Sequence, residues 1–432
     1  MIASIRQRQA AFPRLQVETL SLAQGLHANK LAGVSSTTRP GPDHDRDHHD
    51  SPLFLGIMSG TSLDGLDAVL IKVDETGRPV RLGFWNRPMP EGLRETFLQL
   101  HDPLCQAALL KAQEACLAFA EEVSQLVRAV KKDTHRLGPI QAVGVHGQTI
   151  LHRPELGISL QLNAPAAIAE QTGLVVVSDF RTADLAAKGQ GAPLVPVFHE
   201  AMTGNEEADA LAVLNLGGIA NLTLITRERG THARTQMLGF DTGPANMLMD
   251  LWAKENGRGS FDKDGEFAHS GQANPSFVDL LMQHPFFRKD PPKSTGRDDF
   301  NAHWLKQQLE AFPTPLSAAD VQASLLALSC QSIAKAIPDG TQKLFLCGGG
   351  AKNPYFVQGL QTALEESGRG TRCQLKTTAS LGWAVDEVEA AAFAWLAYLR
   401  LNGLPGNCPE VTGALGPRCL GSITAAGPEQ TQ

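Results

Sequence analysis

The sequence predicts an α/β fold made of two lobes with an internal duplication, and three observations lead to this prediction. The chain has 432 residues, more than one hydrophobic core usually organises, so two lobes are expected. Apolar runs typical of strands alternate with segments of helical periodicity. A strand–loop–strand pattern at 53–73 recurs in the second half of the chain, at 211–225.

The first half begins with a predicted hairpin, in which a loop of glycine, serine, threonine and aspartate at Ser59–Gly65 joins two strands. Apolar residues at spacings of three and four then predict a stretch of helical structure from about Glu91 to Val130. The predicted strands of this half are apolar runs bounded by polar residues: Leu53–Met58, Leu66–Val73, Ile140–Val145 and Leu174–Val177.

The second half repeats the hairpin, with a tight loop at Gly217–Asn221. Its predicted strands are Leu211–Leu216, Leu222–Ile225 and Lys343–Cys347. Helices are predicted from Pro354 onward and over Asp386–Leu401.

Composition narrows the class of protein. The net charge of −7 and the pI near 6.0 argue against nucleic-acid binding, which needs an excess of Lys and Arg. Runs as apolar as a membrane span of about 18–20 residues are absent from the sequence. The 7 cysteines are scattered and form no C-x-x-C pair, which favours a reducing compartment. The sequence therefore predicts a cytoplasmic protein with neither nucleic acid nor membrane as a partner.

The first fifty residues differ from the rest. Arg6, Arg8 and Arg14 stand in a stretch without acidic residues, which resembles a transit peptide, but a secretory signal is excluded because no apolar segment follows. We predict a disordered extension at 1–50, or an artefact of an upstream start codon. The predicted division is then a first lobe at 51–183 and a second lobe at 184–432.

Three glycine clusters suggest a nucleotide site. They lie at Ser59–Gly65, Asn215–Asn221 and Gly348–Asn353. Glycine leaves backbone N–H groups free to approach a phosphate, and the third cluster precedes a helix whose N-terminus favours anions. Each cluster alone is equally well explained as a turn. Together they predict a nucleotide held between two lobes, without a P-loop, since Pro291-Pro292 stand where that motif needs glycine.

Longer motifs follow one another along the chain in a fixed order. They are Gly56–Gly65, His146–Thr149, Ser178–Arg181, Gly189–Pro196, Leu214–Thr223, Gly239–Pro244, Lys293–Arg297, Cys347–Gly350, Phe393–Ala397 and Val411–Ala414. In these motifs the chain resembles the anhydro-N-acetylmuramic acid kinases, a family of the acetate and sugar kinase, Hsp70 and actin superfamily. The resemblance spans about Leu53 to Ser422.

The resemblance implies a two-lobed actin-like ATPase fold, ribonuclease H-like and duplicated, with the nucleotide in the interlobe cleft. It implies ATP and Mg²⁺ as cofactors, without indicating the metal ligands, and a homodimer. The residues that it assigns to the nucleotide are Ser59, Gly60, Thr61, Ser62, Leu63, Asp64, Gly65, Leu66, Gly217, Gly218, Asn221, Gly349, Gly350 and Asn353.

The resemblance also implies an unusual phosphotransferase reaction that belongs to cell-wall recycling. In a 1,6-anhydro sugar O6 is bridged to C1, so water must attack C1 while O6 attacks the γ-phosphate. The products are N-acetylmuramic acid 6-phosphate and ADP. By family position, Asp241 is the general base and Glu389 a ligand of the sugar or of the water. Arg181 suits the lactyl carboxylate, because its planar fork can bind a carboxylate through two hydrogen bonds.

Simpler explanations compete with these assignments. Asp241 could cap a helix that begins at Pro244, Glu389 could be an exposed surface glutamate, and His146 a structural histidine. Two other functions also fit the fold. One is a kinase of the same superfamily for another sugar or small acid, and the other is an ATP-driven conformational module like Hsp70 or actin.

Two positions depart from the family pattern. The family usually has glycine where Lys188 and Ala245 stand. If position 245 requires a positive φ or a close approach by a ligand, the methyl group of Ala245 would strain the site.

Overall fold

The computed structural model describes residues 52–60, 63–102, 104–228, 234–368 and 373–427, which belong to one compact unit. The predicted extension at 1–50 lies outside the described residues, as do Thr61 and Ser62 of the predicted nucleotide site. Within the described ranges, every helix is too short or too polar to cross a membrane.

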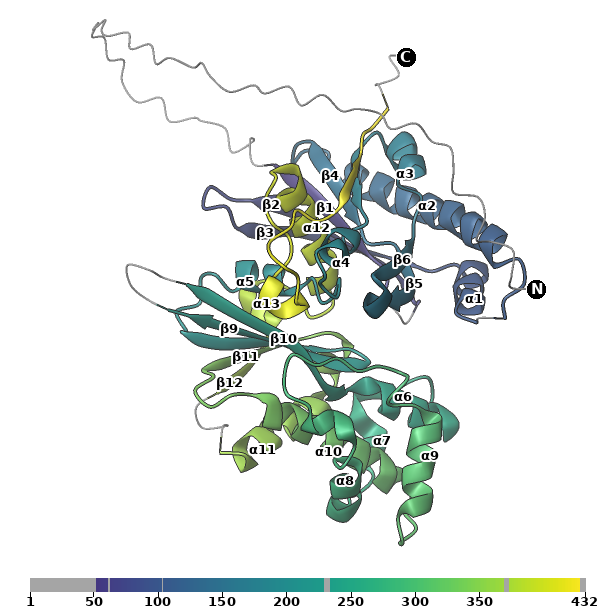
Figure 1. Ribbon diagram of the computed structural model, residues 1–432, viewed down its shortest axis with the longest axis vertical. Helices are drawn as coiled ribbons and strands as arrows, with labels where there is room; N and C mark the ends of the chain where they lie inside the picture. Colours follow the sequence, from purple (N-terminus) through teal and green to yellow (C-terminus); the bar gives the residue numbers. More distant parts are fainter. Residues whose placement is uncertain (1–51, 61–62, 103, 229–233, 369–372, 428–432) are drawn as a thin grey trace, which may run out of the picture. The chain divides into compact units, whose positions relative to one another are not determined.

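The chain forms two large sheets (Figure 1), and five strands of the first follow the same order as the five strands of the second. The first sheet has the order β13-β7-β4-β1-β2-β3 and the second has β10-β9-β8-β11-β12. In each, three antiparallel strands in succession continue into two parallel ones. This matching order confirms the predicted duplication, and the fold is the two-lobed α/β fold of the actin-like ATPases.

The strands of the first sheet are β1 (Leu53–Met58), β2 (Gly65–Val73), β3 (Pro79–Pro88), β4 (Ile140–Val145), β7 (Val175–Ser178) and β13 (Ser422–Thr424). Those of the second are β8 (Ala210–Leu216), β9 (Ile219–Arg227), β10 (Thr235–Pro244), β11 (Lys343–Cys347) and β12 (Gln374–Thr377). A separate two-stranded sheet consists of β5 (Gln148–Arg153) and β6 (Ile158–Leu162).

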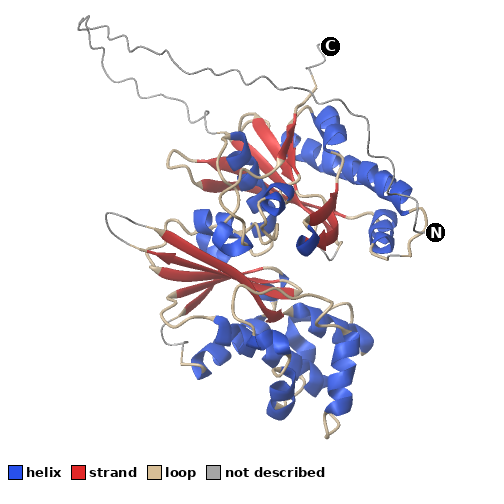
Figure 2. Cartoon of the chain, viewed as in Figure 1, coloured by secondary structure: helices blue, strands red, loops and turns tan. Residues whose placement is uncertain are grey.

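The helices of the first half are α1 (Glu91–Leu100), α2 (Ala108–Asp133), α3 (Pro165–Thr172), α4 (Thr182–Ala186) and α5 (Pro196–Met202). Those of the second half are α6 (Asn246–Glu255), α7 (Glu266–His269), α8 (Pro275–Leu281), α9 (Ala302–Ala311), α10 (Ala318–Ala336), α11 (Pro354–Glu366), α12 (Val388–Leu401) and α13 (Pro409–Thr412). Figure 2 shows that the helices from α6 to α11 gather on one side of the second sheet.

The stretch of helical periodicity predicted over about 91–130 forms two helices, α1 and α2, with a break between them. The break contains a local turn, in which the side chain of Asp102 accepts the backbone N–H of Leu104 at 2.8 Å. The helical periodicity continues across the break because both helices face one core. Phe97 of α1 and Phe119 of α2 meet there edge to face, with ring centroids 6.1 Å apart.

The C-terminal segment returns to the first sheet. Helix α12 packs against β1, β2 and β4, and β13 pairs antiparallel with β7. The division predicted from the sequence assigns this segment to the second lobe at 184–432. The structure differs because the alanines of α12 are fully buried on the first sheet, and they include Ala390 and Ala394.

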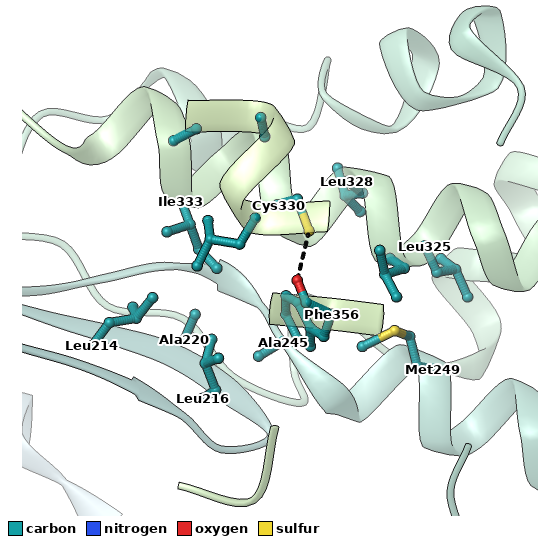
Figure 3. Packing of buried hydrophobic residues seen from close by; sticks show 14 of the residues in the cluster. Leu214, Leu216, Ala220, Ala245, Met249, Leu325, Leu328, Cys330, Ile333 and Phe356 are labelled. Carbon is teal, nitrogen blue, oxygen red and sulfur yellow. Dashed lines mark hydrogen bonds between the residues drawn. The ribbon is translucent and has the colours of Figure 1, made fainter. Parts of the chain in front are cut away.

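The two departures from the family pattern lie in different environments. Ala245 is fully buried in one cluster with Leu216 and Met249 (Figure 3). Its φ is −107°, so position 245 needs no left-handed backbone, and the first of the two predicted sources of strain does not arise. Lys188, in contrast, has a φ of +68°, a conformation that glycine adopts far more readily.

Candidate active site

Asp241 lies on β10, directly opposite Asn221 of β9. Asn221 Nδ2 donates to Asp241 Oδ1 at 2.9 Å, and the backbone N–H of Thr295 donates to Oδ2 at 3.0 Å. The backbone N–H of Asp241 donates in turn to the carbonyl of Lys293 at 2.9 Å. The loop at 293–297, for which the sequence offers no role, therefore orients this carboxylate.

The environment of Asp241 suits a proton acceptor. Burial raises the pKa of its carboxyl group, and the hydrogen bonds from Asn221 and Thr295 oppose that shift. A carboxylate with a raised pKa is a stronger base than one in water, and this favours general base catalysis. The alternative role as a helix cap is wrong, because β10 continues to Pro244 and α6 begins only at Asn246.

Glu389 lies in the first turn of α12 and is partly buried. Asn215 Nδ2, at the end of β8, donates to its Oε1 at 3.3 Å. Burial raises the pKa of Glu389, the charge of Asp67 adds to the shift, and the charge of Arg181 and the Asn215 hydrogen bond oppose it. The alternative of an exposed surface glutamate is therefore wrong.

Arg181 and His146 form a buried pair. Arg181 Nη2 donates to His146 Nε2 at 2.8 Å, and Nη1 donates to the carbonyl of Gly191 at 2.7 Å. A guanidinium group can only donate, so the imidazole is neutral and carries its proton on Nδ1. Burial, with the charge of Arg181, holds the pKa of His146 well below its usual value. Burial lowers the pKa of Arg181 to about 10, so the guanidinium keeps its charge at neutral pH.

Asp184 holds the loop that receives Arg181. Its Oδ2 accepts the backbone N–H of Gly191 at 2.8 Å, and its Oδ1 accepts Asn407 Nδ2 and Thr412 Oγ1, each at 2.7 Å. Two of the sequence motifs, at 189–196 and 411–414, thus meet around one fully buried carboxylate. Asp184 places the carbonyl of Gly191 that orients the guanidinium.

Five buried polar atoms near this pair have no hydrogen-bond partner within the described part of the chain. They are Ser59 Oγ, His146 Nδ1, Gln148 Oε1, Asn163 Oδ1 and Arg181 Nε. Ser59 and His146 follow the paired strands β1 and β4, and Asn163 Nδ2 donates to the carbonyl of Val145 at 3.3 Å. The five atoms therefore gather at the carboxyl ends of parallel strands, where ligands bind in α/β folds. Buried polar atoms without partners point to a polar ligand that supplies them.

The second and third glycine clusters lie against each other. The carbonyls of Gly217 and Gly218 accept backbone N–H groups from the start of α6, and Asn246 Nδ2 donates to the carbonyl of Gly217 at 2.7 Å. A Cβ on Gly350 would lie 2.9 Å from Asn246 Nδ2, so only glycine permits this approach. Asn353 caps α11 by accepting the backbone N–H of Phe356 at 3.0 Å.

The first glycine cluster follows β1. The backbone N–H of Leu63 donates to the carbonyl of Gly60 at 3.2 Å, and Leu63 has a φ of +56°. The carbonyl of Asp64 accepts the backbone N–H of Met89 at 3.0 Å. Gly60 and Leu63 are thereby joined beside Ser59, at the same strand ends as the unpartnered polar atoms.

Several site residues were missed by the reasoning from sequence. Thr295, Asn215 and Gln148 stand inside motifs that the resemblance carries, but no pattern among their neighbours marks their side chains. Asn246 and Asn163 stand outside those motifs, and only the folded chain brings them to the site.

A duplicated α/β fold, two carboxylates oriented by hydrogen bonds and a cluster of buried polar atoms without partners in the described chain are features expected of a kinase that acts on a sugar. Residues 52–426 match the family model described as anhydro-N-acetylmuramic acid kinase, and the chain belongs to this family. It is 44% identical over 379 residues to the anhydro-N-acetylmuramic acid kinase of Bordetella avium, covering 86% of this chain and 96% of that protein. It is 42% identical over 380 residues to that of Pseudomonas syringae pv. tomato, covering 86% of this chain and 99% of that protein.

Among solved structures, the chain is similar to a ROK family glucokinase from Streptomyces griseus in complex with glucose and AMPPNP. The identity is 12% and the TM-score 0.35, covering 79% of this chain and 97% of that chain. A likeness at this level carries no argument about the site.

Proposed function

We propose that this protein opens 1,6-anhydro-N-acetylmuramic acid with water and phosphorylates O6 from ATP. The oxygen of water forms a bond to C1 while the C1–O6 bond breaks. O6 then bonds to the γ-phosphorus, whose bond to the ADP oxygen breaks, and the proton of the water passes to Asp241. The products are N-acetylmuramic acid 6-phosphate and ADP.

The environment of Asp241 is the observation that carries this proposal. A base that activates water must be oriented and more basic than a carboxylate in water. Asp241 meets both conditions, since two donors hold its oxygens and burial raises its pKa. Glu389, whose pKa burial also raises, would orient the sugar or the attacking water.

The unpartnered polar atoms support a sugar as the second substrate. A muramic acid derivative offers hydroxyl, amide and carboxylate groups, and these match the donors and acceptors of the buried cluster defined above. Arg181 is expected to contact the lactyl carboxylate. Its Nη1 and Nη2 each make one hydrogen bond within the protein, and its Nε keeps an N–H group for the ligand.

We assign the nucleotide to the three glycine clusters, whose bare backbone suits phosphates. Magnesium ions in such sites take one or two carboxylates together with the phosphates. Asp64 and Asp67 fit this role, because the charge of Asp64 raises the pKa of Asp67 beyond the effect of burial and a cation would relieve that repulsion. The ion would neutralise charge on the transferring phosphate.

Three further expectations concern the cellular compartment, the oligomeric state and the metabolic role. The 7 cysteines are all free thiols, as expected for a cytoplasmic enzyme. The homodimer and the role in peptidoglycan recycling and amino-sugar catabolism follow from the family and stay predictions.

A coupled ADP-release assay with ATP, Mg²⁺ and the anhydro sugar tests the function. Asp241→Asn is expected to lower turnover by about a hundredfold, with nucleotide binding intact. Free N-acetylmuramic acid, which has an open O6 hydroxyl group, is the control acceptor. ADP release with that sugar and none with the anhydro sugar would replace the proposal by an ordinary sugar kinase.

A further inference from the structure

Two asparagines at the end of the β8–β9 hairpin donate hydrogen bonds to the two carboxylates of the proposed active site. Asn215 and Asn221 lie opposite each other in the β8–β9 pair, so their side chains point to the same face of the sheet. Asn221 donates to Asp241, which belongs to the neighbouring strand. Asn215 donates to Glu389, which belongs to a helix packed on the other sheet.

The amide group of Asn215 is oriented by its surroundings. A Cβ on Gly348 would lie 2.1 Å from Asn215 Oδ1, so the oxygen rests directly on the bare Cα of Gly348. Gly348 has a φ of +80°, which glycine adopts readily. With the oxygen held on this side, the Nδ2 group faces Glu389.

Two further interactions connect this part of the second sheet to the segment just before α12. The backbone N–H of Gly348 donates to the carbonyl of Val385 at 2.6 Å. Lys352 Nζ forms an ion pair with Asp386 Oδ2 at 2.9 Å. The turn that leads into α12 is thereby anchored, and the Asn215 amide adds a contact to the carboxylate of Glu389 itself.

Charged and titratable groups face Glu389 from several elements. Asp67 of β2 repels its charge and Arg181, before α4, attracts it. Cys347 of β11 is the register partner of Asn215, and burial with the charge of Glu389 keeps its thiol protonated. Among these groups, the amide of Asn215 is the neutral donor that favours the ionised carboxylate.

We propose that Asn215 is a positioning residue of the reaction, which orients Glu389 from the hairpin that also orients Asp241. This inference rests on the proposed function. It implies that side chains of one hairpin in the second sheet position both carboxylates, although Asp241 and Glu389 come from different halves of the fold.

The test compares Asn215→Ala and the isosteric Asn215→Asp with the wild type. We expect kcat to fall about tenfold in Asn215→Ala, as for loss of a hydrogen bond to a charged group, with the KM of ATP unchanged. The acidic limb of kcat/KM should move to higher pH, because the lost donor stabilised the ionised form. Asn215→Asp should shift the limb further, since it adds a repelling charge. Asn402→Ala, at the far end of α12, is the matched control and should leave activity unchanged.

A double-mutant cycle with Glu389→Gln shows whether Asn215 acts through Glu389. We expect Asn215→Ala to cost little in the Glu389→Gln background. Additive losses, an unmoved acidic limb, or a rise in the KM of ATP alone would each overturn the inference.

A carboxyl ¹³C NMR titration tests the inference independently of enzyme activity. The signal of Glu389 is assigned as the one that disappears in Glu389→Gln. A higher pKa of Glu389 in Asn215→Ala supports the inference, and an unchanged one overturns it. If the wild-type protein is inactive but the pKa of Glu389 is higher in Asn215→Ala, the result would contradict the proposed function and still support the contact between Asn215 and Glu389.

Discussion

Gly56 of β1 lies directly opposite Gly144 of β4, and the backbone of α12 rests on this pair of glycines. A Cβ on Gly56 would lie 2.0 Å from the carbonyl oxygen of Ala390, and one on Gly144 would lie 2.2 Å from that of Phe393. The two bare Cα atoms therefore set the distance between helix and sheet. Since Glu389 stands at the start of α12, they also set its position.

Gly56→Ala is expected to destabilise the protein by about 3 kcal/mol or more, because the methyl group meets helix backbone that cannot turn aside. Turnover should fall as well, since α12 carries Glu389. Urea unfolding and the ADP-release assay measure the two effects. Gly92→Ala, in α1 with open space around its Cα, is the control and should gain about 0.5–1 kcal/mol. A Gly56→Ala protein of normal stability would contradict the close contact.

Substitution by glycine at the two positions that depart from the family pattern should have opposite effects on the stability of the protein. Lys188→Gly relieves a φ of +68° and is expected to stabilise the protein by about 0.5–1 kcal/mol. Ala245→Gly removes a fully buried methyl group at a φ of −107° and is expected to cost about 1 kcal/mol or more. Thermal unfolding of both variants checks the signs. A shift of both melting temperatures in one direction would contradict this interpretation.

Asp250→Asn should alter the pH dependence of stability. Burial raises the pKa of Asp250 to about 7, and the charge of Asp262 adds to the shift. A carboxyl group with a raised folded-state pKa contributes stability that is complete below its unfolded pKa of about 3.9 and is lost as pH rises through 7. An amide cannot ionise, so the advantage of the variant over wild type should grow by about 1–2 kcal/mol between about pH 5 and 8.

Urea unfolding at the two pH values measures this difference. The exposed Asp279 supplies the control variant, Asp279→Asn, which makes the same substitution at the protein surface. An equal advantage of Asp250→Asn at both pH values would show that Asp250 ionises normally in the folded protein.

Arg181→Lys should weaken binding of the sugar and leave the nucleotide unaffected. The lysine ammonium is a point charge, and it cannot reach both His146 and the carbonyl of Gly191 while facing a ligand. We expect the KM of the sugar to rise about 10- to 100-fold. Arg400→Lys, at the far end of α12, is the control and should behave as wild type. An unchanged KM for the sugar would remove Arg181 from the substrate site.

The duplicated hairpins and the position of the proposed general base could be predicted because their signals are local. Each strand of the two hairpins is a continuous apolar run, and it forms a strand wherever it packs. The strand Lys343–Cys347 has the predicted bounds for the same reason. The resemblance selected Asp241 from a string of adjacent residues, and its place on β10 beside the second hairpin agrees with that choice.

The rest could not be read from neighbouring residues. The alanine-rich sequence of α12 does not indicate which sheet it packs on, and its close packing on the first sheet depends on the bare Cα atoms of Gly56 and Gly144. The hydrogen bond from Asn215 to Glu389 joins residues separated by most of the second half of the chain. By itself the sequence determined the fold class, the family and the hairpins, because short-range patterns encode them. Only the tertiary structure decided which donors orient the carboxylates and which buried polar atoms have no partner in the described chain. Both depend on distant segments packing together.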